Sequence, residues 1–112
     1  MTDLAAVDGY FDAIRRRDVE ALAALFTDDA QLVTLAGTFV GPVAIAAFYR
    51  DLAFAVDDLW PEPGHYVVDG ERVGVEIRLR MNGKVSLVGD FFTLAGDKIA
   101  RLAIYGGPPA ET

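Results

Sequence analysis

The chain has 112 residues, 53% of them hydrophobic, and a formal net charge of −7, which predicts one domain with its own core over residues 1–112. An acidic chain repels phosphate backbones, which argues against nucleic acid as a partner. The absence of cysteine excludes disulfides and thiolate metal sites. No apolar run reaches membrane-spanning length, and the N-terminus lacks the basic start of a signal peptide. These features predict a cytoplasmic protein.

The first half of the sequence is typical of helices. Over residues 3–17, apolar side chains such as Val7, Phe11 and Ile14 recur at helical spacing. Asp18 is a suitable N-cap for a second, short helix over residues 19–26. Strands are predicted at 31–35 and 36–41. A third helix follows over 41–54, with Pro42 in its first turn, where a missing N–H breaks no helical hydrogen bond.

The second half is typical of strands. Residues 72–81, "RVGVEIRLRM", alternate between apolar and polar side chains with a period of two. Asn82-Gly83 is a strong hairpin turn, because a type I′ turn needs positive φ at both central residues. Further strands are predicted over 84–94 and 99–106, with a loose tail after them. Helices followed by an antiparallel meander predict an α+β fold, with the helices packed on one face of a curved sheet.

Asp90 is the residue of the second half that calls for an explanation. It lies in the middle of the apolar stretch "SLVGDFFTL", although aspartate is depleted in strands and burial of its charge is costly. Three interpretations remain open from the residues alone. Asp90 is a buried structural residue, an outward-facing residue paired with Arg78 or Arg80, or a functional acid in a cavity.

The order of elements and three stretches resemble the nuclear transport factor 2-like superfamily of cone-shaped α+β domains. The stretches are "GYFDAIRRRDVEALAALFTDDAQLV", "GPVAIAAFYR" and "GDFFTLAGDKIARLAIYG". Within the superfamily, the chain is most similar to ketosteroid isomerases and SnoaL-like polyketide cyclases. This fold hosts many functions, so the resemblance implies the fold more firmly than any one reaction.

The resemblance to ketosteroid isomerases implies roles for individual residues. Tyr10 matches the tyrosine that donates a hydrogen bond to the substrate oxyanion, and Asp90 matches the second donor, an aspartic acid held neutral by its apolar site. Tyr49 matches a supporting tyrosine, whereas Phe26 replaces a further one. At the position of the general base, an aspartate in the family, this sequence has Thr34, which cannot abstract a proton.

The resemblance also implies a closed apolar cavity for a small hydrophobic molecule. Its expected lining residues are Thr34, Tyr49, Trp60, Leu79 and Phe92. Trp60 could cover the cavity mouth or fill the core. His65 is the only histidine and therefore a spare candidate for the base, although an exposed position fits it better.

Two functions are expected from these observations. The first is an isomerase- or cyclase-like enzyme that acts on a carbonyl-bearing, steroid- or polyketide-like molecule, with Asp90 and Tyr10 as catalytic residues. The second is a ligand-binding or structural domain without catalysis. No cofactor is expected, and no metal, because the acids are scattered. The polar outer row of Glu76, Arg78 and Arg80 suits either a homodimer interface or solvent.

Overall fold

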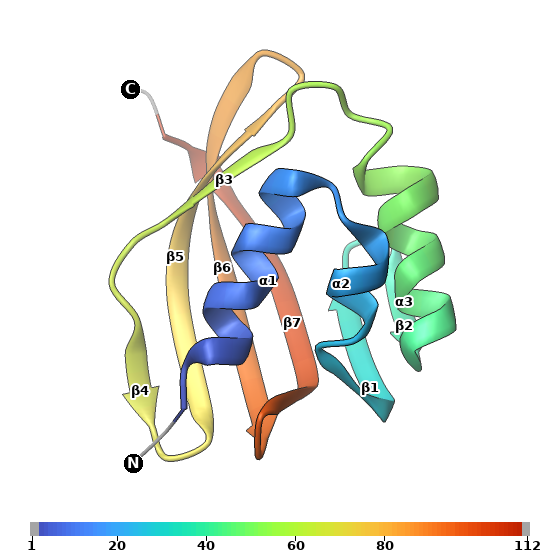
Figure 1. Cartoon of the computed structure of the whole chain (residues 1–112). Helices are drawn as coiled ribbons and strands as arrows, with labels where there is room; N and C mark the ends of the chain where they lie inside the picture. The colour runs from blue at the N-terminus through green and yellow to red at the C-terminus, as the bar shows by residue number, and fades with distance from the viewer. Residues whose placement is uncertain (1–2, 111–112) are drawn as a thin grey trace.

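The structure, a computed structural model, describes residues 3–110. Helices lie against one face of a curved sheet (Figure 1). The helices are α1 (Ala5–Arg16), α2 (Val19–Ala23) and α3 (Pro42–Phe48), and α3 continues into a π-helical turn, Tyr49–Ala53. The strands are β1 (Phe26–Thr34), β2 (Gly37–Val40), β3 (Trp60–Pro63), β4 (Val67–Asp69), β5 (Arg72–Met81), β6 (Lys84–Ala95) and β7 (Lys98–Pro109). The predicted α+β fold is confirmed.

Within residues 3–110 the strands form one sheet in the order β2-β1-β7-β6-β5-β3, with β4 beside the other end of β5. Strands β5, β6 and β7 form the predicted antiparallel meander. Strand β1 runs parallel to β7, with Leu32 opposite Leu102. This pair joins the two halves of the chain.

Local signals account for the start of α2 and for the β5–β6 turn. The Asp18 side chain caps α2 by accepting a hydrogen bond of 3.0 Å from the Ala21 N–H. Asn82 and Gly83 have φ of 54° and 78°, the positive values that the β5–β6 hairpin requires. In each case a local side-chain or backbone preference places the boundary.

Three segments differ from the predictions because tertiary pairing decides them. Helix α2 ends at Ala23, and Phe26 instead opens β1 opposite Ile99. Strand β3 was not predicted, because its two prolines disfavour a strand, but it pairs along β5 at the edge of the sheet. The predicted loose tail continues β7 to Pro109, and the Ala110 N–H donates to the Val85 carbonyl at 3.0 Å.

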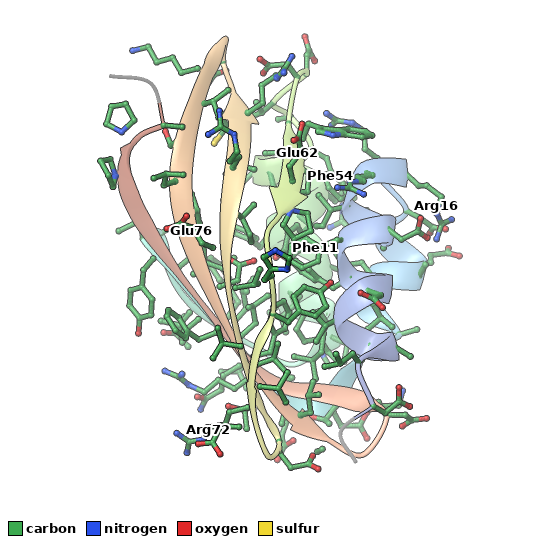
Figure 2. All side chains as sticks on the ribbon, turned by 90° about the vertical axis from the view of Figure 1, so that its left-hand side faces the viewer. Phe11, Arg16, Phe54, Glu62, Arg72 and Glu76 are labelled. Atoms are coloured by element: carbon green, nitrogen blue, oxygen red, sulfur yellow. The ribbon has the colours of Figure 1, made fainter. Side chains whose placement is uncertain are left out.

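The core lies between the helices and the inner face of the sheet. Figure 2 shows Phe11 in this space and Glu76 on the opposite side of the sheet. On β5, Val73, Val75 and Ile77 are buried, whereas Glu76 is exposed, as the period of two predicts. Among the described residues, no helix is long and apolar enough to cross a membrane.

Candidate functional site

A cavity of about 500 Å³ lies between the helices and the inner face of the sheet. Strands β5 and β6 both show where it opens. Along β5, exposure rises from 2% at Ile77 to 38% at Met81, and along β6 it rises from the buried Asp90 toward the half-buried Ser86. The mouth therefore lies at the β5–β6 hairpin end, beside the exposed Leu52 and Leu35.

Asp90 lies in the deep part of this cavity. It occupies the inner face of β6, with Val75 and Ile104 as cross-strand neighbours, and its side chain is only 3% exposed. Within residues 3–110 its carboxyl has no hydrogen-bond partner. Burial alone raises the pKa of Asp90 from 3.8 to about 7, because a carboxylate loses its hydration in an apolar site. The inward position rules out pairing with Arg78 or Arg80 on the outer face.

Two tyrosines lie beside Asp90. Helix α1 supplies Tyr10 and the π-helical turn supplies Tyr49, and their hydroxyl oxygens are 2.5 Å apart, within hydrogen-bond distance. Burial raises the pKa of both hydroxyls, and the negative charge of Asp90 raises it further. Both side chains therefore stay protonated at neutral pH. Two hydroxyls carry two protons and the bond between them uses one, so the pair can offer one O–H to a ligand.

The other expected lining residues have different positions. Leu79 lines the cavity wall. Phe92 lies on the inner face of β6 but is not part of the cavity lining. It is buried in the core, with its ring centroid 5.4 Å from that of Tyr10. Thr34 lines the cavity near its mouth, but its hydroxyl donates to the Gly37 carbonyl and accepts from the Ala36 N–H, both at 3.1 Å. The Thr34 side chain therefore stabilises the β1–β2 turn.

Trp60 and His65 lie outside the cavity lining. Trp60 is 43% exposed, and the Arg15 guanidinium lies 5.3 Å from the centroid of its ring. His65 is exposed and borders a hollow on the outer face of the sheet. The structure therefore brings together Tyr10, Tyr49 and Asp90, with Thr34 and Leu79 farther along the same cavity.

Sequence reasoning missed two features of the cavity. Ser86 lines the outer part of the cavity on the same face of β6 as Asp90, and the alternation of that strand could have predicted this. Asp58 clasps the hairpin at the mouth, since its carboxylate accepts hydrogen bonds of 2.7 Å from the N–H groups of Asn82 and Gly83. Asp58 and the hairpin are distant in sequence, and no local signal connects them.

The chemistry of the site rests on one carboxyl group. Of the side chains that line the cavity within residues 3–110, Asp90 is the only carboxyl, and none is cationic or a histidine. The same part of the chain contains no cluster of His, Asp and Glu that could hold a metal ion. A polar inner end with apolar walls suits a ligand that carries a carbonyl or hydroxyl oxygen at one end.

Comparison with solved structures gives close matches in fold. A protein from Sinorhizobium meliloti assigned as a polyketide cyclase is 31% identical, with a TM-score of 0.81 over 88% of this chain and 92% of that one. A protein from Kribbella flavida assigned as a ketosteroid isomerase is 18% identical, with a TM-score of 0.82 over 96% of this chain and 79% of that one. TerC, co-crystallised with polyporic acid, is 19% identical, with a TM-score of 0.80 over 92% and 89%.

No curated protein matches the chain. A family model, the SnoaL-like domain, matches residues 7–102. That range runs from α1 into β7 and contains Tyr10, Tyr49 and Asp90. The two structures below 25% identity show the shared nuclear transport factor 2-like fold. The family match, together with the 31% identity to the Sinorhizobium protein, shows that the chain belongs to the SnoaL-like domain family.

Proposed function

We propose that this protein is an isomerase- or cyclase-like enzyme that moves a proton on a carbonyl-bearing, steroid- or polyketide-like molecule. One observation carries the proposal. Asp90 is a lone carboxyl, 3% exposed, in the inner part of an apolar cavity, and its pKa is raised to about 7. A group with a pKa near the working pH is both available as a base and effective as an acid.

The cavity residues support a specific division of labour. The free O–H of the tyrosine pair donates to the carbonyl oxygen of the substrate. Ionised Asp90 removes a proton from the carbon next to that carbonyl, and the electron pair moves onto the oxygen as an enolate. Asp90 then returns the proton to another carbon, which restores the carbonyl and the carboxylate. Hydrogen bonds aimed at the developing oxyanion lower the barrier.

This division differs from the one that the resemblance to ketosteroid isomerases implies. In those isomerases a separate aspartate is the base, and the residue that matches Asp90 only donates a hydrogen bond to the substrate oxygen. Here Thr34 holds the base position, and its hydroxyl is engaged in a turn. Both halves of the proton transfer therefore fall to Asp90. The names of the structural relatives, a polyketide cyclase and a protein crystallised with polyporic acid, support a substrate of this class.

The alternative function is ligand binding without catalysis, which the missing separate base favours. Proton exchange in D₂O distinguishes the two. We expect the protein to incorporate deuterium next to the carbonyl of 2-tetralone or a 5-ene-3-ketosteroid, measured by mass spectrometry. Asp90→Asn should still bind the ketone but exchange it roughly 10²–10⁴-fold more slowly. Binding without exchange in the wild type would refute the enzyme and leave the binding function.

A further inference from the structure

The outer part of the cavity contains a polar side chain, Ser86, that the proposed chemistry does not use. Ser86, Val88 and Asp90 are alternate residues of β6 and all line the cavity. At about 3.4 Å per residue, Ser86 lies about 14 Å from Asp90 along the strand. The wall between them is apolar and includes Ile77, Leu79 and Val88. The cavity is thus polar at two separated places on one wall.

The hydroxyl of Ser86 is available to a ligand. Within residues 3–110 it makes no hydrogen bond. Its cross-strand neighbours are Leu79 and Pro109, and the side chains of both are apolar. By contrast, the hydroxyl of Thr34, the other one near the mouth, is already bonded to its own turn.

The charge of the lining restricts what Ser86 can recognise. No cationic side chain lines the cavity within the described part of the chain, and Asp90 contributes negative charge when ionised. A carboxylate or phosphate on the ligand would lose its hydration there without a counter-charge. A neutral hydroxyl or keto oxygen loses less hydration free energy on entering the cavity, and it gains a hydrogen bond with Ser86.

We propose that Ser86 is a specificity-determining residue, which binds a hydroxyl or keto oxygen at the far end of an elongated, neutral ligand whose carbonyl lies beside Tyr10 and Asp90. The inference deepens the proposed function, because it uses the same cavity and orientation. It narrows the substrate class to rigid polycyclic carbonyl compounds that carry an oxygen at each end. A short monocyclic ketone would reach only the inner end.

Two steroids that differ only at the far end test this proposal. Testosterone carries a 3-keto group and a 17-hydroxyl, and androst-4-en-3-one lacks the hydroxyl. We expect the wild type to bind testosterone about 5–10-fold more tightly, as one neutral hydrogen bond allows. Ser86→Ala should remove this preference. Of two variants of nearly equal shape, Ser86→Thr should keep it and Ser86→Val should lose it.

Binding is measured by titration calorimetry, after thermal melting has confirmed that each variant folds. Equal affinity of the wild type for both steroids, binding of neither, or a preference that survives in Ser86→Val would overturn the role of Ser86. Asp90→Asn separates this result from the proposed catalysis. This variant should slow deuterium exchange by the factor given above yet retain the preference for the 17-hydroxyl. The catalytic proposal can therefore fail while the role of Ser86 stands, and the role of Ser86 can fail while the catalytic proposal stands.

Discussion

The protonation of Asp90 links the cavity to the stability of the fold. Its pKa is about 7 when folded and 3.8 ordinarily, so between these values the folded state holds a proton that the unfolded state has released. The contribution of this bound proton to the free energy of unfolding is therefore fully present below pH 4, and it is lost as the pH rises to about 7. At about 1.4 kcal/mol per pKa unit, the loss is roughly 4 kcal/mol.

Asp90→Asn keeps the shape of the side chain but removes this titration. We therefore expect the variant to gain stability relative to the wild type between pH 4 and pH 8, measured by urea unfolding. Most of the gain should be complete near pH 7. Parallel stability profiles for the two proteins would mean that Asp90 is not a buried neutral acid.

The Tyr10–Tyr49 hydrogen bond should be visible as a coupling between two buried hydroxyls. Replacement of either tyrosine by phenylalanine leaves the other hydroxyl without its partner and should cost about 1–2 kcal/mol of unfolding free energy. The double variant removes both groups and should cost less than the sum of the two. Strictly additive losses in a double-mutant cycle would show that the hydroxyls do not interact.

The individual residues were predictable to different extents. Asp90 is recognisable in the sequence because it is a polar group within an apolar strand pattern. Tyr10 fits the apolar face of its helix, and only the family resemblance places it in one cavity with Asp90. Ser86 gives no such signal, since serine on a strand is ordinary. Trp60 was misleading, because a tryptophan is commonly buried, whereas here it stacks with Arg15 at the surface.

At the scale of elements, a bulge shapes the cavity mouth. Leu87 of β6 lies opposite two residues of β7, Gly107 and Pro108, because the register shifts between Ser86 and Val88. A Cβ at position 107 would collide with the Leu87 carbonyl oxygen, whereas one at Gly106 would meet only a Leu35 methyl at 3.5 Å. Of these two glycines, only Gly107 is therefore required by close approach of the backbone.

This difference predicts unequal effects of two neighbouring substitutions. Gly107→Ala should destabilise the protein by about 1–3 kcal/mol, since backbone must move, and Gly106→Ala should leave stability nearly unchanged. Thermal melting of the two variants measures the contrast. Equal melting temperatures would show that the bulge adapts to a side chain.

Another element-scale prediction concerns the clasp between Asp58 and the hairpin. The N–H groups of Gly83 and Asn82 stabilise the carboxylate and hold the pKa of Asp58 below its ordinary value. Asp58→Ala should free these amides, so that their hydrogen exchange accelerates and ligands leave the cavity faster. Asp57→Ala serves as the neighbouring control. Unchanged hydrogen exchange at the amides of Asn82 and Gly83 would show that Asp58 does not stabilise the hairpin.

At the scale of the whole molecule, we propose that the outer face of the sheet binds a second copy. Phe91 and Tyr105 are each 52% exposed there and their rings contact each other. Glu76 and the arginines at 78 and 80 add charges of both signs, which allows a face to complement itself across a two-fold axis. We expect light scattering to show a dimer, and Phe91→Glu to yield monomers. A monomeric wild type at micromolar concentration would rule this assembly out.

The α+β class and the helical cover could be predicted because hydrophobic periods of 3.6 and 2 are local properties. The parallel pairing of β1 with β7 could not be predicted, because the alternation of a strand does not specify which other strand it pairs with. The cavity likewise depends on side chains from α1, the π-helical turn, β5 and β6 that are distant in sequence. Such features follow from long-range packing and appear only in the folded chain.

The pairing of β1 with β7 also has a consequence for folding kinetics. Strand β7 lies between β1 and β6, so the two halves of the sheet meet only when Lys98–Pro109 are in place. Residues near 32 must find residues near 102, and such distant contacts slow folding, because a long loop has to close before they form. During synthesis, the edge of β1 that pairs with β7 therefore stays exposed until Lys98–Pro109 are made. In that interval the exposed edge can pair with other nascent chains.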